Sequence, residues 1–215
     1  MIKKDFDIII VGAGVSGLVL ADEITKRTNK KVLLLEKEKK LKFEKNLCFW
    51  NIPYNILNKC ADNKWKKVCV IIKGKKHSLN LNGIEYLRIK SKNLYNFFLS
   101  RLKKRKNFNI IMGVNIKSLK SNNNIVEINT EKKVYTSHLL FDSRMDTNLE
   151  KSERLLQHFY GVEITFKESI INEDEAILMD IQNKKNNFNF IYVLPFSQNK
   201  ILVETTYFSK RTLSR

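Results

Sequence analysis

Three glycines and an acid near the amino terminus have the spacing of a site that binds a dinucleotide. Gly12, Gly14 and Gly17 lie between a short apolar run and a helical pattern, and Glu36 ends the next apolar run. In a G-x-G-x-x-G turn the first glycine allows the bend, the second lets the backbone approach a pyrophosphate, and the third lets helix and strand pack closely. The helix N-terminus offers free N–H groups to the phosphates, and the acid accepts hydrogen bonds from a ribose diol. These four residues are therefore the predicted dinucleotide site.

A second candidate for chemistry is the carboxyl group of Glu204, in the apolar stretch ILVETTYFS at 201–209. Alternation with a period of two places Glu204 on the strand face that carries Leu202, Thr206 and Phe208. A carboxyl in an apolar place has a raised pKa and can donate a proton. A charge at a solvated edge strand explains the same residue, and the strand alone favours that interpretation.

The segments after the glycine motif favour FAD over NAD. The motif lies at the start of the chain, as is typical of FAD enzymes, and a helix at 91–106 leads to a third parallel strand at 109–113. Three short strands follow, and a further apolar strand ends in Asp142. This order is that of two-dinucleotide-type flavoproteins. Asp142 is either a turn-forming acid or a contact of the cofactor, and the sequence leaves both open.

The fold class predicted from these elements is α/β, with two domains. A Rossmann-like FAD-binding domain of the two-dinucleotide-binding type takes residues 1–66 and 89–148. A truncated antiparallel β-sheet substrate domain takes residues 67–88 and 149–215. Aromatic residues in its strands form either its core or a pocket for a large apolar substrate; they are Phe159, Tyr160, Phe188, Phe190, Tyr192, Phe196, Tyr207 and Phe208.

Composition argues against several other classes. The net charge is +18, but Lys outnumbers Arg about four to one and the basic residues are scattered, so we expect no nucleic-acid partner. The charge is consistent with a weak attraction to an anionic membrane surface. Three cysteines and three histidines show no metal-ligand spacing, which predicts a metal-free protein in a reducing compartment. No apolar run is long enough to span a membrane.

Several blocks of the chain resemble the lycopene cyclases, the flavoprotein type of bacteria and plastids. They are LCFW (47–50), FDSR (141–144), LLQHFYGVEI (155–164), AILMD (176–180) and FIYVLPFSQNKILVETTYFS (190–209). The sequence departs from the family pattern at Asn46-Leu47, at Gly161-Val162-Glu163, and in lacking Pro after Arg144. Members of the family are nearly twice as long, so we expect the chain to be an amino-terminal fragment that does not turn over alone.

The resemblance implies a non-redox reaction in carotenoid biosynthesis. An acid protonates one end of lycopene or another acyclic carotenoid, the cation closes an ionone ring, and loss of a proton ends the reaction. FAD is required in its reduced form, with NAD(P)H as the electron source. The resemblance assigns the essential glutamate to Glu204, with Glu163 and Asp180 as rival acids, and adds Asp142 and Arg144 to the cofactor-binding candidates.

The same resemblance implies that the protein is cytoplasmic and attached peripherally to a membrane, because its substrate is dissolved in the bilayer. Two other function classes remain open. One is another FAD-dependent oxidoreductase, such as a prenyl reductase or an aromatic hydroxylase. The other is an inactive remnant.

Overall fold

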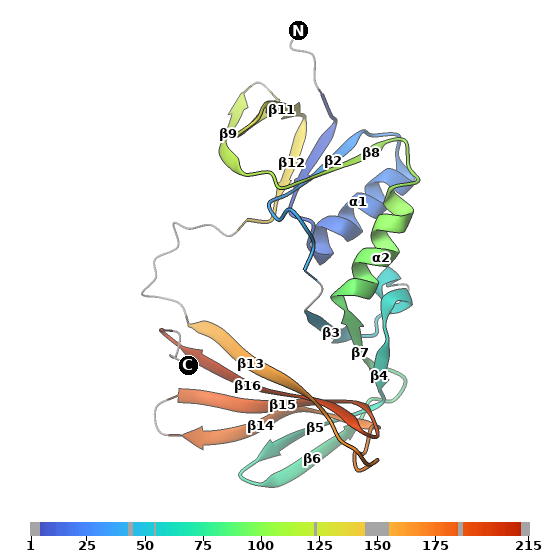
Figure 1. The fold of residues 1–215 in the computed structure, drawn as a ribbon, viewed down its shortest axis with the longest axis vertical. Helices are drawn as coiled ribbons and strands as arrows, with labels where there is room; N and C mark the ends of the chain where they lie inside the picture. The colour runs from blue at the N-terminus through green and yellow to red at the C-terminus, as the bar shows by residue number, and fades with distance from the viewer. Residues whose placement is uncertain are drawn as a thin grey trace. The chain divides into compact units, whose positions relative to one another are not determined.

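The computed structural model describes residues 5–42, 45–53, 55–122, 124–144, 155–184 and 187–211 (Figure 1). The chain divides into two compact units, each made from two separate segments. The first unit is Met1–Lys45 with Lys90–Thr147, and the second is Asn46–Ile89 with Asn148–Arg215. Within the described ranges, no helix is both long and apolar enough to cross a membrane.

A four-stranded parallel sheet organises the first unit. Its strands lie in the order β12, β1, β2, β8, with bounds Leu139–Asp142, Ile8–Val11, Val32–Glu36 and Phe108–Met112. All three neighbouring pairs are parallel. β1 and most of β2 are buried runs of β-branched and aliphatic residues, as expected for strands covered on both faces. The predicted third strand and the apolar strand ending at Asp142 are confirmed.

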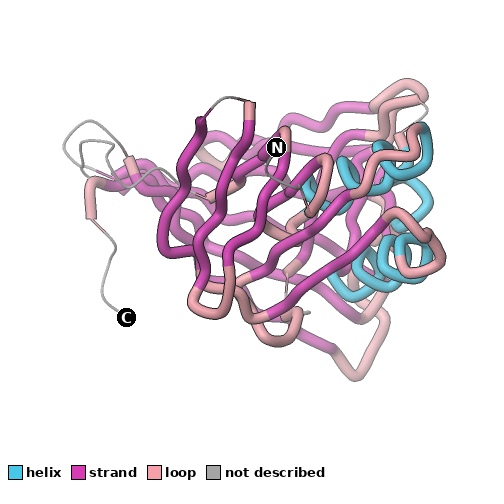
Figure 2. The backbone as a smooth tube through the Cα atoms, turned by 90° about the horizontal axis from the view of Figure 1, so that it is seen from above, coloured by secondary structure: helices cyan, strands magenta, loops and turns pink. Residues whose placement is uncertain are grey.

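Helices cover one face of this sheet, and a three-stranded meander covers the other. The helices α1 (Val15–Arg27) and α2 (Ser91–Leu102) lie next to each other, shown in cyan in Figure 2. The meander consists of β9 (Ile116–Asn122), β10 (Ile125–Thr130) and β11 (Val134–Ser137). Ile9, Leu33 and Leu35 form one buried cluster with Ile128 and Tyr135 of the meander. Alternation along each strand directs the intervening residues to the helical face.

The two helices are joined through a buried acid, Asp22, which has no exposed surface. Its carboxylate oxygens lie 3.1 Å from Arg101 Nη2 and 2.7 Å from Arg105 Nη2. Arg105 Nη1 also donates to the Asp22 carbonyl and to the Thr25 hydroxyl. A carboxylate this deeply buried is tolerated because two guanidinium groups neutralise it and satisfy its lone pairs.

Replacing Asp22 with Ala is expected to lower the free energy of unfolding by about 1.5–3 kcal/mol, because the partly buried guanidinium groups of Arg101 and Arg105 lose the carboxylate that they share. The matched control is Glu23→Ala, which removes an exposed pair with Arg27 at 2.7 Å and should cost less than about 1 kcal/mol. Urea denaturation of both variants measures the difference. Equal costs would show that the buried pair does not join the helices.

The second unit is built on a six-stranded sheet in the order β13, β16, β15, β14, β5, β6. The strand bounds are Leu156–Thr165, Lys200–Ser209, Asn187–Ser197, Glu175–Lys184, Lys67–Ile72 and Lys75–Asn80. The sequence predicted a fully antiparallel sheet, but β5 pairs with β14 in parallel. The sheet is mixed because the β5–β6 hairpin comes from the earlier segment and joins beside β14 in the same direction.

A small sheet of three strands completes this unit: β3 (Asn46–Trp50), β7 (Tyr86–Lys90) and β4 (Asn63–Trp65). Trp65 is buried against Leu194 and Leu202, and its Nε1 donates to the Pro195 carbonyl at 3.1 Å. Residues 46–66, which the sequence placed in the FAD-binding domain, therefore belong to the second unit. β7 was expected in the large sheet and instead pairs with β4.

Candidate functional site

Gly12 and Gly17 form a turn that no larger residue could occupy. Gly12 has φ = +102°, a conformation that favours glycine, and a Cβ there would collide with Ser143 Oγ. A Cβ on Gly17 would collide with the Gly12 carbonyl oxygen and lie 3.4 Å from Ile10 Cγ2. The two glycines thus have the tight-turn and close-packing roles that the sequence predicted.

Gly14 differs from the other two glycines because its flank is open. A Cβ built on Gly14 would meet nothing within 4 Å. Gly14 is the N-cap residue of α1, no side chain caps this end of the helix, and its first turn has no acidic residue. Uncapped N–H groups and a partial positive charge at a helix start suit a phosphate. The turn therefore fits a pyrophosphate group.

Glu36 lies at the carboxyl end of β2 and is bound by backbone N–H groups. Its Oε2 accepts from Ala13 N at 2.7 Å, and its Oε1 accepts from Glu38 N at 3.0 Å. These bonds hold the carboxylate beside the glycine turn. A carboxylate has about four lone-pair sites, so Glu36 keeps capacity for the hydroxyl groups of a ribose.

Asp142 and Arg144, both predicted as cofactor contacts, form an ion pair with each other. Arg144 donates from Nε to Asp142 Oδ1 at 3.0 Å and from Nη2 to Oδ2 at 2.7 Å. The hydrogen bonds from the Arg144 side chain hold the pKa of Asp142 below its ordinary value. Asp142 pairs with Val11 across the sheet, so the pair lies at the same edge as the glycine turn. Contact with a cofactor remains a prediction for both residues.

Sequence reasoning missed Ser143, between these two residues. Its Oγ donates to the Val11 carbonyl at 2.6 Å, and its side chain fills the space that a Cβ on Gly12 would need. Ser143 therefore supports the glycine turn from the neighbouring strand. The sequence carries no signal for this contact, because it depends on the parallel pairing of β12 with β1.

Glu204 lies in the middle of β16, between two unlike neighbours. Gly161 of β13 pairs with it on one side and Tyr192 of β15 on the other. The carboxyl is half-buried, and Thr206 Oγ1 donates to its Oε1 at a long 3.4 Å. Desolvation raises the pKa of Glu204, and the hydrogen bond from Thr206 partly opposes the rise. Glu204 is thus an acid that holds its proton to a higher pH than an ordinary glutamate does.

The two rival acids have different surroundings. Glu163 is on the same sheet face but lies 2.7 Å from Lys200 Nζ, in an ion pair that favours the carboxylate. Asp180 pairs with Ile191, which in turn pairs with Thr205, so Asp180 is on the opposite face. Glu204 combines an aromatic neighbour, Tyr192, with a pKa that desolvation raises.

Glu204 should make the free energy of unfolding depend on pH. Its folded-state pKa lies above the ordinary 4.5, so the folded protein holds this proton more tightly than the unfolded chain. Stability from this group is therefore present below pH 4.5 and is lost as the pH rises through the folded-state pKa. Urea denaturation of the parent and of Glu204→Gln, compared at each pH, isolates this contribution. A parent-minus-variant difference that is independent of pH would contradict the shifted pKa.

Tyr192 belongs to a hydrogen-bonded group that the sequence did not reveal. Its hydroxyl lies 2.9 Å from the hydroxyl of Tyr86, and the Cys48 thiol is hydrogen-bonded to both. Burial raises the pKa of Tyr86 to about 12 and also raises the pKa values of Tyr192 and Cys48. All three groups are therefore neutral at physiological pH. They come from β3, β7 and β15, so their meeting depends on the tertiary fold.

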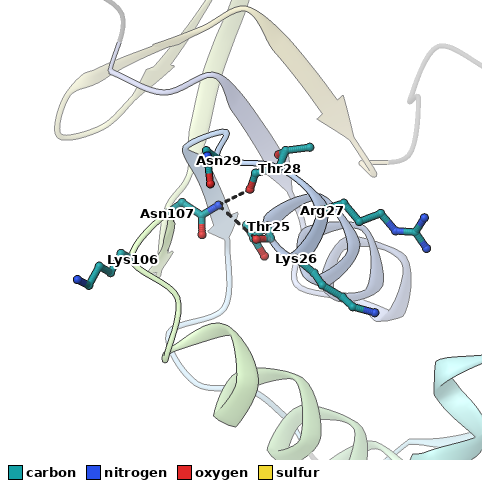
Figure 3. A pocket seen from close by; sticks show the side chains of 7 residues that line it. All are labelled: Thr25, Lys26, Arg27, Thr28, Asn29, Lys106 and Asn107. Atoms are coloured by element: carbon teal, nitrogen blue, oxygen red, sulfur yellow. Dashed lines mark hydrogen bonds between the residues drawn. The ribbon is translucent and has the colours of Figure 1, made fainter.

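Two hollows in the described structure lie away from these residues. One, of about 320 Å³, is at the C-terminal end of α1, where Asn107 Nδ2 donates to the Thr28 carbonyl at 2.9 Å (Figure 3). Its basic side chains, Lys26, Arg27 and Lys106, point in different directions (Figure 3), so it resembles a helix C-cap more than an anion site.

The second hollow, of about 280 Å³, is on the face of the large sheet opposite Glu204, and it includes Tyr160, Asn189 and Tyr207. The predicted aromatic set is mixed: Phe190 is buried, whereas Phe159 and Phe188 are exposed. In the described ranges no group of three or more His, Cys, Asp or Glu side chains could hold a metal ion.

Comparison with known structures relates this fold to flavoproteins. The chain is similar to pqsL, a probable FAD-dependent monooxygenase from Pseudomonas aeruginosa, with a TM-score of 0.68 and 11% identity over 94% of this chain and 60% of that one. It is also similar to the halogenase PltM in complex with phloroglucinol and FAD, with a TM-score of 0.66 and 12% identity over 95% and 52%. The fold is therefore the α/β fold of FAD-binding proteins.

Two plant proteins are similar to the chain in sequence. It is 25% identical to the chloroplastic neoxanthin synthases of Solanum tuberosum and Solanum lycopersicum, over 95% of this chain and 44% of theirs. The chain thus spans less than half the length of these relatives. The family model described as lycopene cyclase protein matches residues 7–215. Since this match covers almost all of the sequence, the chain belongs to the lycopene cyclase family.

Proposed function

We propose that the protein takes part in carotenoid biosynthesis as a lycopene cyclase that uses reduced FAD. The observation that carries the proposal is the site of Glu204: an acid with a raised pKa beside a neutral tyrosine, in a chain of the lycopene cyclase family. Alkene protonation needs a carboxyl that keeps its proton to a high pH, and desolvation shifts the pKa of Glu204 in that direction.

In the proposed reaction, the Glu204 O–H bond breaks and a C–H bond forms at the terminal double bond of the carotenoid. The resulting carbocation is attacked by a second double bond, which closes the ring. The ring then loses a proton, so no electrons are gained or lost overall. Aromatic side chains near the cation stabilise it by ~0.5–2 kcal/mol each.

FAD is proposed to bind through Gly12, Gly14, Gly17 and Glu36, with Asp142 and Arg144 at the same sheet edge. When bound and reduced, the flavin supplies negative charge that stabilises a nearby cation. NAD(P)H is the proposed electron source. A net charge of +18 and a lipid-soluble substrate support peripheral attachment to an anionic membrane surface.

A redox function is the second candidate, because the similar solved structures include a probable FAD-dependent monooxygenase. The two functions differ in stoichiometry. In deuterated water, without oxygen and with reduced FAD, the protein encoded by the complete reading frame containing residues 1–215 should convert lycopene in liposomes to a cyclic product. This product should carry deuterium from the solvent. Product formation that consumes NADPH or oxygen mole for mole would instead identify an oxidoreductase.

A further inference from the structure

The side chain of Glu204 lies between a glycine on one neighbouring strand and a tyrosine on the other. A Cβ built on Gly161 would lie 3.3 Å from Glu204 Cβ and 3.2 Å from Leu202 Cδ1, closer than side chains normally pack. The stem of Glu204 therefore lies over bare backbone on that side. On the other side, directly opposed residues of antiparallel strands have Cβ atoms ~4.5–5.5 Å apart, so Tyr192 stands next to the acid on the same face.

The ring of Tyr192 is held by contacts from two other strands. Its hydroxyl is bound by Tyr86 at 2.9 Å and by the Cys48 thiol. The ring of Tyr86 is itself held by Trp50, with ring centroids 4.8 Å apart, and by Trp65 at 6.0 Å. A side chain fixed at its hydroxyl end keeps its ring in one orientation, so the ring beside Glu204 is preorganised.

The electrostatic environment on the Tyr192 side of Glu204 favours a cation over an anion. Tyr192 is a neutral phenol whose ring faces carry partial negative charge. The buried guanidinium of Arg88 would oppose a cation nearby, but Asp62 neutralises it through Arg88 Nε and Nη2, both at 3.0 Å. The Tyr192 side is therefore neutral, aromatic and fixed.

We propose that Tyr192 stabilises the positive charge that develops next to Glu204, and that Tyr86 and Cys48 are positioning residues that hold its ring. This inference rests on the proposed role of Glu204 as proton donor. It assigns a cation-binding function to Tyr192, and it predicts that the site prefers a cation to a neutral molecule of the same shape. A cation–π contact corresponds to a preference of about 2- to 30-fold.

The test uses the chain with Glu204→Gln, because an ionised Glu204 would attract any cation by charge alone. Choline and its neutral carbon isostere, 3,3-dimethylbutan-1-ol, are titrated separately, and binding is followed by NMR shifts. We expect choline to bind about 2- to 30-fold more tightly than the isostere. Equal affinity in this background would overturn the proposal.

Substitutions at position 192 then identify the ring as the cause. Tyr192→Phe should keep most of the preference, and Tyr192→Leu should abolish it. Fluorinated phenylalanines at this position conserve size while weakening the ring's negative face, so the preference should fall as fluorine atoms are added. The matched control is Tyr207→Leu, on the opposite face of the sheet, which should leave the preference unchanged. A preference that survives Tyr192→Leu or is constant across the fluorinated series contradicts the assignment.

A separate set of variants tests whether Tyr86 and Cys48 position the ring of Tyr192. Tyr86→Phe and Cys48→Ala each remove a hydrogen bond to the Tyr192 hydroxyl and should reduce the preference, whereas Cys48→Ser keeps an acceptor for that hydroxyl and should retain the preference. If Cys48→Ala and Cys48→Ser behave alike, the thiol does not position the ring. None of these measurements requires proton transfer, so their failure leaves the role of Glu204 standing. Conversely, cyclisation by Glu204→Gln would refute the proposed function without altering the binding preference.

Discussion

The substitution Glu204→Gln should lower the rate of ring formation by about 10²–10⁴-fold, the usual contribution of a general acid. Gln conserves the size and polarity of the side chain but has no acidic proton to give to an alkene. The pKa of Glu204 is raised by desolvation, so the parent rate should also fall as the pH rises above that pKa. The first measurement expresses the complete reading frame in lycopene-accumulating cells and analyses the carotenoid products. The second measures the rate of ring formation by the purified protein as a function of pH.

The matched control is Glu163→Gln, an acid on the same sheet face that is paired with Lys200 at 2.7 Å. This variant should form rings at close to the parental rate, and both variants should retain FAD. If Glu204→Gln is active and Glu163→Gln is not, the proton donor is Glu163 and Glu204 is a structural residue.

The substitution Gly14→Val should weaken FAD binding by about 100-fold or more. The valine side chain would occupy the open space where a pyrophosphate approaches the helix N-terminus. Two lost charge-assisted hydrogen bonds at ~1.5–3 kcal/mol each account for this loss. Gly14 has φ = −73°, and a Cβ added at this position would have no neighbour within 4 Å, so the fold should tolerate the change.

Gly17→Ala provides the contrast, because its Cβ would collide with the Gly12 carbonyl oxygen. This variant should lose thermal stability as well as FAD, whereas Gly14→Val should lose only FAD. Calorimetric titration with FAD and thermal melts separate the two cases. Parental FAD affinity in Gly14→Val would remove the glycine turn from the proposed cofactor site.

Local pattern predicted the parallel strands, the helices and the meander of the first unit. Gly12, Gly14 and Gly17 between an apolar strand and a helix specify a strand–turn–helix by their backbone requirements alone. The meander and the strand ending at Asp142 followed in the predicted order. In the second unit, the same reasoning located the strands of the large sheet but assigned residues 46–66 to the FAD-binding domain and predicted a fully antiparallel sheet, whereas β5 is parallel to β14.

The sequence by itself determined the glycine turn, the succession of strands along the chain and the candidate acid, because each depends on residues close together in the chain. Only the tertiary structure decided what surrounds that acid. Tyr192 and Gly161 flank Glu204 through strand register, and Cys48 and Tyr86 reach Tyr192 from a different sheet. Tyr86 and Tyr192, whose hydroxyl groups are in contact, are more than 100 positions apart in the chain. Desolvation and hydrogen bonding between distant residues set the pKa of a carboxyl, and no local pattern encodes them.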